Sequence, residues 1–143
     1  MSSENIRAAI IATDFNKDIV DPMIEAAQDE LKQSSGHVAQ VVRVPGAYEI
    51  PIIADILMRQ SEIDLVVVLG YIERGETLHG EVMGQVVHRA FVDLELKYGK
   101  VIGIGIIGPG ATLEQAKVRN IDYARAAAKA AVRNHKTVGS LRV

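Results

Sequence analysis

Cysteine and tryptophan are both absent from this chain of 143 residues, which has only two Phe and four Tyr. The lack of cysteine excludes disulfides, thiolate nucleophiles and Cys-ligated zinc or iron–sulfur sites, and it suits a reducing compartment. Because aromatic residues make up only 4% of the chain, the core must be built from Ile, Val, Leu and Ala. Hydrophobic residues at 48% and charged residues at 24% are typical of a globular domain rather than a disordered chain.

The chain also has no large excess of charge of either sign, since it contains 18 acidic and 16 basic residues and its net charge is −2. The chain therefore has no basic surface that would hold nucleic acid or an anionic membrane by charge alone. Its longest strongly apolar run, residues 65–69, is far shorter than the ~20 residues of a membrane-spanning helix, and the N-terminus has no apolar signal segment. We therefore expect a soluble, cytoplasmic protein with one domain over residues 1–143.

Short β-branched runs alternate with longer helical patterns along the whole chain. Strands are predicted at residues 6–12, 37–44, 65–69 and 100–107. Helices are predicted at residues 22–33, 48–59, 81–98, 112–118 and 121–135. Asp21 fits the N-cap of the first helix, and Pro22 fits its first helical position, where the missing N–H costs nothing. Thr112 is a candidate cap for the helical region that follows the last strand.

This alternation implies right-handed βαβ crossovers and an α/β fold. We expect a three-layer αβα sandwich with a four-stranded, mainly parallel sheet in flavodoxin-like order. In such sheets ligands bind outside the carboxyl ends of the strands. The segments that follow the predicted strands are rich in Gly, Pro, aromatic and polar residues, at positions 13–16, 45–49, 70–79 and 108–110. The sequence therefore predicts a small-molecule site at that edge of the sheet.

Three common site motifs do not fit. Residues 103–108 match the bare Gly-x-Gly-x-x-Gly pattern, but two of its glycines lie inside a predicted strand and Pro109 follows the third. Glycines in a strand more often mark close backbone approach, so we do not expect a dinucleotide site. Glu76, His79 and His88 lack the spacing of metal ligands on one helical face, and no Gly-x-Ser-x-Gly elbow is present.

The predicted loop over residues 71–79 carries the most chemistry. Gly75 allows a tight turn before a helix, where free N–H groups and the Thr77 hydroxyl can cradle a phosphate. His79, at the mouth of that helix, is of the residue type suited to proton transfer near neutral pH. The alternative is an ordinary loop in which a solvated histidine caps the helix.

Two residues outside this loop also have two interpretations. Phe15 lies in a polar segment, where it is either a platform for a flat heterocycle or a staple against the following helix. Arg119 follows the turn at residues 108–110 and is either a bidentate phosphate clamp or a member of a surface ion pair.

Together, four segments of the chain resemble the lumazine synthase family, whose members catalyse the penultimate step of riboflavin biosynthesis. The segments are Asp14-Phe15-Asn16, residues 44–51 (Val-Pro-Gly-Ala-Tyr-Glu-Ile-Pro), residues 69–79, and Glu114-Gln115-Ala116 with Arg119. They follow the family order between Ile6 and Val132, and residues 108–112 look most like archaeal members. The resemblance implies condensation of 5-amino-6-ribitylaminouracil with 3,4-dihydroxy-2-butanone 4-phosphate, with no cofactor and no metal.

The resemblance also implies a role for each matching residue. His79 would be the general acid–base, and Phe15 would stack on the pyrimidine ring. The other implied site residues are Ala47, Tyr48 and Glu49 for the ribityl chain and pyrimidine, Tyr71, Ile72 and Glu73 for the pyrimidine, Glu76 and Thr77 for the phosphate, Ile104 for a pocket wall supplied by the neighbouring subunit, and Arg119 for the phosphate clamp. Family members form pentamers, some stacked into icosahedral shells, so a homo-oligomer with shared sites is implied.

Three positions depart from the family pattern. Glu73 stands where an apolar residue is usual, Gly80 replaces an aromatic residue, and the lysine that often follows the arginine clamp has no counterpart. These departures leave a second hypothesis open, a non-catalytic lumazine- or flavin-binding protein or a cage-forming structural protein on the same fold.

Overall fold

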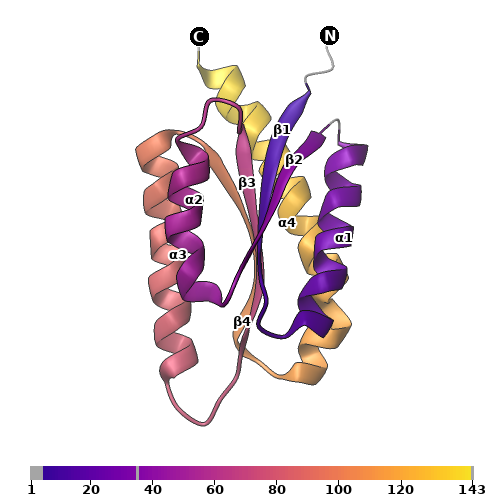
Figure 1. Ribbon diagram of the computed structural model, residues 1–143, viewed down its shortest axis with the longest axis vertical. Helices are drawn as coiled ribbons and strands as arrows, with labels where there is room; N and C mark the ends of the chain where they lie inside the picture. The colour runs from indigo at the N-terminus through magenta and orange to yellow at the C-terminus, as the bar shows by residue number, and fades with distance from the viewer. Residues whose placement is uncertain (1–4, 35, 143) are drawn as a thin grey trace.

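The computed structural model describes residues 5–34 and 36–142. Its elements form three layers, in which one parallel sheet lies between two layers of helices (Figure 1). The sheet has the order β2-β1-β3-β4, and every neighbouring pair is parallel. The strands are β1 (Ile6–Thr13), β2 (Gly36–Val44), β3 (Leu65–Glu73) and β4 (Val101–Ala111). The predicted α/β class and flavodoxin-like strand order are confirmed.

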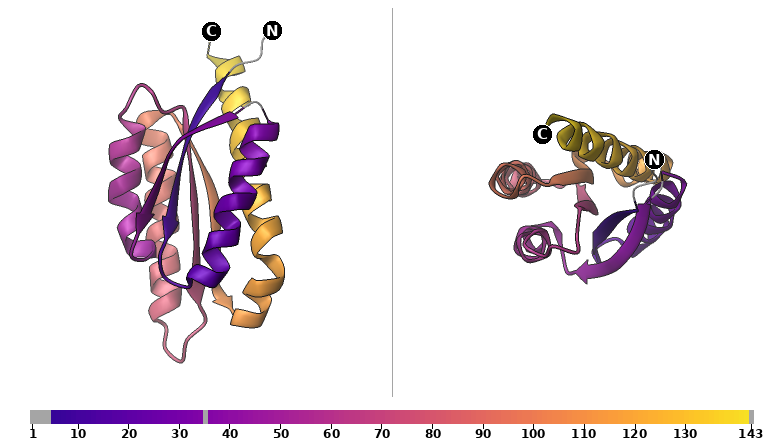
Figure 2. Two further views of the ribbon diagram at one scale, coloured as in Figure 1. Left: turned by 45° about the vertical axis from the view of Figure 1, so that its right-hand side comes forward. Right: turned by 90° about the horizontal axis from the view of Figure 1, so that it is seen from above.

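Helices cover both faces of the sheet, with α1 and α4 on one face and α2 and α3 on the other (Figures 1 and 2). Their bounds are α1 (Lys17–Gln33), α2 (Ile50–Met58), α3 (His79–Tyr98) and α4 (Leu113–Leu141), and a 3₁₀ helix at Ala47–Glu49 precedes α2. No helix in the described part of the chain combines the length and hydrophobicity needed to cross a membrane.

The core lies on both faces of β3, whose residues are buried as far as Ile72. Alternate side chains of this strand point to opposite layers, with Leu65 and Val67 packing beneath α1 and α4, and Val66 and Val68 beneath α2 and α3. A strand covered on both faces has no solvent side, which explains the unbroken apolar run at residues 65–69.

Three glycines of β4, at positions 103, 105 and 108, allow close packing. A Cβ atom placed on Gly103 would lie 2.6 Å from the Ala127 carbonyl oxygen and 2.8 Å from the Ala131 Cβ. Helix α4 therefore rests directly on the strand backbone, and only glycine leaves room for it. The Gly-x-Gly-x-x-Gly pattern at residues 103–108 is thus a packing feature, as the sequence context predicted.

Helix α1 begins five residues earlier than predicted. Its N-cap is Asn16, in the left-handed conformation with φ 58°, and Pro22 lies inside the helix instead of at its first position. Buried Ile19 and Val20 give the additional turn an apolar face, which stabilises it although Pro22 removes one backbone donor. Asp21, predicted as the N-cap, instead pairs with Arg43 at 2.9 Å.

Strands β3 and β4 are both longer than predicted. Tyr71, Ile72 and Glu73, which we placed in a loop, belong to β3, because Tyr71 pairs with Ile107 and Glu73 with Ala111. The predicted turn at residues 108–110 correspondingly lies within β4. Pairing between the two extensions provides hydrogen-bond partners for backbone N–H and C=O groups that, in a loop, would be hydrogen-bonded to water.

Helix α4 is one continuous helix, whereas the sequence predicted two segments separated near residue 120. Asn120, which lies between the two predicted segments, is 7% exposed, and its side chain donates a hydrogen bond to the Ile19 carbonyl oxygen at 3.0 Å. This tertiary contact stabilises a residue with low helix propensity inside the helix. The predicted N-cap is confirmed, because Thr112 and Gln115 form a reciprocal capping box.

Candidate active site

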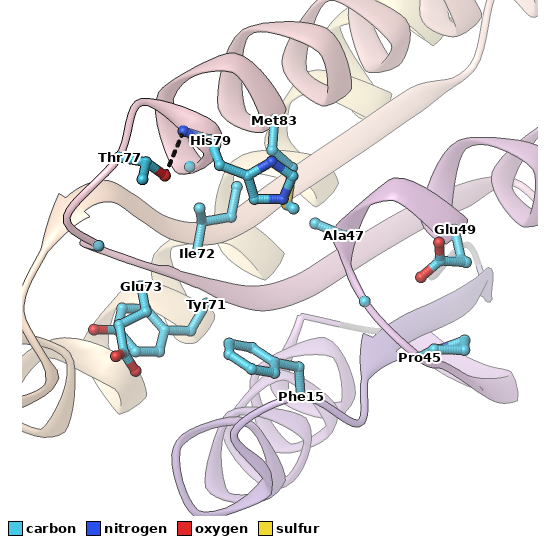
Figure 3. Close-up of a pocket in the computed structure, with 13 residues that line it drawn as sticks. Phe15, Pro45, Ala47, Glu49, Tyr71, Ile72, Glu73, Thr77, His79 and Met83 are labelled. Carbon is cyan, nitrogen blue, oxygen red and sulfur yellow. Dashed lines mark hydrogen bonds between the residues drawn. The ribbon is translucent and has the colours of Figure 1, made fainter.

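A cavity of about 460 Å³ opens at the carboxyl ends of β1, β2 and β3 (Figure 3). This is the edge of the sheet at which the sequence predicted a ligand site, and the volume suits a small molecule. The lining residues are Phe15, Pro45, Gly46, Ala47, Glu49, Tyr71, Ile72, Glu73, Gly75, Thr77, His79, Gly80 and Met83.

Phe15 presents an exposed aromatic ring to this cavity. The segment after β1 is fixed against the end of β2, because the Asp14 N–H donates to the Val44 carbonyl at 2.7 Å and the Phe15 N–H to the Pro45 carbonyl at 3.2 Å. Phe15 is 52% exposed, and its ring points into the cavity (Figure 3). A staple would bury the ring against a helix, so the structure favours a platform on which a flat molecule can stack.

The turn before α3 brings Thr77 and the start of the helix to the rim of the cavity. The Arg74 N–H donates to the Ala111 carbonyl at 3.0 Å, which anchors the turn to the end of β4. The Thr77 hydroxyl oxygen accepts a hydrogen bond from the His79 N–H at 3.3 Å. Backbone N–H groups at the first turn of a helix carry partial positive charge, so this rim is suited to an anion.

His79 is the first residue of α3, and its imidazole stands over the cavity (Figure 3). The ring meets the aromatic ring of Tyr48 in an edge-to-face contact, with centroids 6.0 Å apart and planes inclined by 65°. An exposed imidazole at the mouth of a cavity is placed to exchange protons with both a bound molecule and solvent.

Two carboxylates and a tyrosine line the cavity. Glu49 and Glu73 each contribute an acidic side chain, while the Tyr71 hydroxyl donates to the Ala111 carbonyl oxygen at 2.9 Å. Burial raises the pKa of Tyr71, and the negative charge of Glu73 raises it further. The Tyr71 phenol therefore remains neutral and acts as a structural donor, whereas Glu49 and Glu73 remain available as acceptors.

Residues 5–138 match the family model described as 6,7-dimethyl-8-ribityllumazine synthase. The chain belongs to this family. A relative with that name from Metallosphaera sedula is 38% identical over 141 residues, which cover 99% of this chain and 93% of the relative. One from Aeropyrum pernix is 40% identical over 131 residues, or 91% of this chain and 89% of the relative. The predicted resemblance to archaeal members of the lumazine synthase family is confirmed.

Most of the site residues predicted from the family resemblance meet at the cavity within one chain. Phe15 follows β1, whereas Thr77 and His79 lie together at the start of α3, and all three line the same space. The other predicted residues that line it are Ala47, Glu49, Tyr71, Ile72 and Glu73.

Four predicted residues lie outside the cavity of the single chain. Tyr48 contacts the His79 ring, and Glu76 is exposed in the turn that precedes α3. Ile104 lines a separate hollow of about 400 Å³ between β4 and α4, and Arg119 is exposed on α4. The family match covers all four positions.

Sequence reasoning did not single out Met83, Pro45 or Gly46 as site residues, although all three line the cavity. Met83 follows His79 by four residues, so helical spacing alone places both side chains on the same face of α3. Pro45 and Gly46 belong to the segment after β2, whose position at the sheet edge the sequence predicts, although it does not indicate which of its residues contact the cavity. Within the described residues, no group of three or more His, Asp or Glu side chains is arranged to hold a metal ion.

Proposed function

We propose that this protein is a lumazine synthase, which condenses 5-amino-6-(D-ribitylamino)uracil with 3,4-dihydroxy-2-butanone 4-phosphate to give 6,7-dimethyl-8-ribityllumazine, phosphate and water. The observation that carries the proposal is that Phe15, Glu49, Thr77 and His79 line one cavity in a chain that matches the family over residues 5–138. An aromatic platform, a hydroxyl acceptor, an anion-binding rim and a proton-transfer group are the functions that the two substrates require.

The proposed roles follow from the chemistry of each residue. Phe15 stacks on the pyrimidine, and the Glu49 carboxylate accepts hydrogen bonds from hydroxyls of the ribityl chain. The rim at Thr77 and the start of α3 bind the phosphate of the second substrate. Ala47, Tyr71, Ile72 and Glu73 are proposed further contacts to the pyrimidine, and Glu76 to the phosphate-binding turn.

His79 is the proposed general acid–base. Attack of the pyrimidine amine on the ketone forms a carbon–nitrogen bond, and the carbonyl oxygen leaves as water once protons have moved from nitrogen to oxygen. Elimination of phosphate and ring closure need further proton transfers, which one imidazole can mediate near neutral pH. Holding the two reactants side by side can contribute up to ~7–11 kcal/mol to the rate enhancement, so few catalytic side chains are required.

We further propose that the active site is completed by a second copy of the chain. The cavity lining contains two carboxylates and no Lys or Arg, yet one substrate carries a phosphate. Arg119 could neutralise that phosphate as a bidentate clamp, but it lies on α4 outside the cavity of its own chain. A pentamer in which a neighbour supplies Arg119 and Ile104, with stacking of pentamers into a shell as a further step, accounts for both placements.

Two broader expectations accompany this proposal. We propose that residues 1–143 act as one domain, because the helices and strands of the described residues all pack on a single sheet. A cytoplasmic location stays a prediction from the cysteine-free composition.

The direct experiment mixes both substrates with the purified protein and follows the absorbance and fluorescence of the lumazine product. We expect a rate well above the uncatalysed background, and a loss of about 10²–10⁴-fold in His79→Asn if His79 is the sole acid–base. A folded protein that shows no rate above background would overturn the proposal. Tight lumazine binding without turnover would instead support the non-catalytic binding protein.

A further inference from the structure

Tyr48 lies beside the cavity rather than in its lining. It sits in the 3₁₀ helix at Ala47–Glu49, is 41% exposed, and directs its ring at His79 on α3 (centroids 6.0 Å apart, planes 65° apart). The neighbouring residues Ala47 and Glu49 do line the cavity. The fold therefore directs the middle residue of this short helix toward a histidine 31 positions later in the chain, and not toward the space where a substrate would bind.

The imidazole of His88, the second histidine of α3, has a hydrogen-bond partner, whereas that of His79 has none among the described residues. The Nδ1 atom of His88 lies 2.6 Å from the Gly84 carbonyl oxygen, and its ring also makes an edge contact with Phe91, with centroids 6.1 Å apart and planes inclined by 67°. No hydrogen bond joins the His79 imidazole to another group in residues 5–34 and 36–142. His88 is thus oriented by a hydrogen bond and an aromatic edge contact, whereas His79 has only the aromatic contact.

We propose that Tyr48 is a positioning residue for His79, whose imidazole it holds over the cavity through an edge-to-face contact. Such contacts restrict ring rotation and are favourable at the separation and inclination observed here. A general acid–base acts only when its nitrogen lies within hydrogen-bond reach of the reacting atoms, so restricting the ring raises the rate of proton transfer. The catalytic part of this inference rests on the proposed function, whereas the ring contact itself does not.

The phenol and the ring of Tyr48 can be separated by two substitutions. Tyr48→Phe keeps the ring and removes the hydroxyl, and Tyr48→Leu removes the aromatic contact while keeping an apolar side chain of moderate size. Since Tyr48 is half-exposed, both variants should fold, and Tyr48→Met is a second ring-free variant in case Tyr48→Leu does not. Thermal unfolding of each variant checks this before any kinetic comparison.

Steady-state kinetics test the catalytic effect. We expect kcat to fall by about 3- to 10-fold in Tyr48→Leu, as the strength of an aromatic pair implies, with KM for both substrates unchanged and Tyr48→Phe close to the unmodified protein. In a His79→Asn background, Tyr48→Leu should cause no further loss. A raised KM with unchanged kcat would overturn the inference and make Tyr48 a substrate contact. An equal loss in Tyr48→Phe would overturn it in favour of the hydroxyl.

Nuclear magnetic resonance of the resting protein tests the contact without substrates. The Tyr48 ring should shift the carbon-bound proton signals of the His79 imidazole, which are assigned by their disappearance in His79→Asn. Tyr48→Leu should move these signals and leave those of His88 in place, while Tyr48→Phe should move them little. If the signals move as expected but no lumazine is formed, the proposed function fails while the ring contact stands. Signals that do not move in Tyr48→Leu overturn the inference whatever the activity.

Discussion

The two phenylalanines of this chain occupy opposite environments, and the difference separates binding from stability. Phe15 is 52% exposed at the cavity, and Phe91 is fully buried between α3 and the sheet. Phe91→Ala should lower the free energy of unfolding by about 3–5 kcal/mol, because it leaves a void in the core. Phe15→Ala should lower it by less than about 0.5 kcal/mol, as expected for an exposed side chain. Urea denaturation of both variants measures the difference.

Substrate binding by Phe15→Ala tests the role of Phe15 as a platform. Because stacking of a base on an aromatic ring is worth about 1–3 kcal/mol, Phe15→Ala should weaken pyrimidine binding by at least about 5-fold. Calorimetric titration with the pyrimidine substrate measures this loss of affinity. If Phe15→Ala destabilised the protein as much as Phe91→Ala, Phe15 would be a staple after all.

Arg7 and Asp64 form an ion pair whose strength should depend on pH. The Asp64 carboxylate accepts hydrogen bonds from the Arg7 backbone N–H at 2.7 Å and from its Nε at 3.2 Å. Burial acts to raise the pKa of Asp64, but the hydrogen bonds and charge of Arg7 outweigh burial and hold that pKa below its ordinary value of 3.8. Asp64 is therefore easier to ionise in the folded than in the unfolded state, so the pair stabilises the fold above the unfolded pKa and loses this effect as the pH falls through the lowered folded pKa.

The free energy of unfolding of Asp64→Asn should accordingly be lower than that of the unmodified protein near pH 7. The difference between the two free energies should become smaller below about pH 4. Urea denaturation at several pH values measures it. Asp93→Asn is the matched control, because it removes an exposed pair with Arg89 in which the two side chains are 60% and 80% exposed. Such pairs contribute little at any pH. A difference for Asp64→Asn that stays constant down to pH 3 would show that the pair acts through packing rather than charge.

At the scale of elements, α3 and β4 approach each other closely at Gly84. A Cβ atom on Gly84 would lie 2.5 Å from Cδ and 2.7 Å from Cγ of Pro109, whose ring cannot rotate away. Gly84→Ala should therefore destabilise the protein, because an overpacking penalty of about 1–3 kcal/mol exceeds the gain in helix propensity. Gly139→Ala in α4 meets no atom within 4 Å and should raise stability by up to about 1 kcal/mol. Thermal unfolding of both variants distinguishes a packing effect from a general effect of glycine in a helix.

The distance between interacting residues along the chain explains which element boundaries the sequence could predict. Where the signal is local, as in the Thr112 capping box or the apolar run at residues 65–69, prediction and structure agree. Where the signal depends on a distant partner, they differ. Asn120 remains helical because it donates to a carbonyl in α1, and Tyr71 remains in a strand because β4 extends beside it. Neither partner can be identified from the local sequence, in which Asn120 is only a polar residue and the segment around Gly108 is only rich in glycine.

At the scale of the whole molecule, topology made most of the site predictable. Once strand–helix alternation predicts a parallel sheet, the segments after its strands must meet at one edge, so Phe15, residues 45–49 and Thr77 were expected to lie together. Arg119 and Ile104 do not join them within one chain. The contribution of these two residues by another subunit, which we propose, would leave no periodicity or spacing in the sequence, so only the family resemblance indicates it.

Mixed oligomers provide a test of the shared site. Chains with His79→Asn and chains with Arg119→Ala should each be nearly inactive alone, since each lacks one essential group at every site. If a site combines His79 of one subunit with Arg119 of its neighbour, unfolding and refolding an equal mixture should restore about a quarter of the sites, those in which both contributions are intact. The mixture before refolding is the control, because its subunits have not exchanged. If the refolded mixture is no more active than the mean of its parents, both groups act within one subunit and the proposed assembly of the site is wrong.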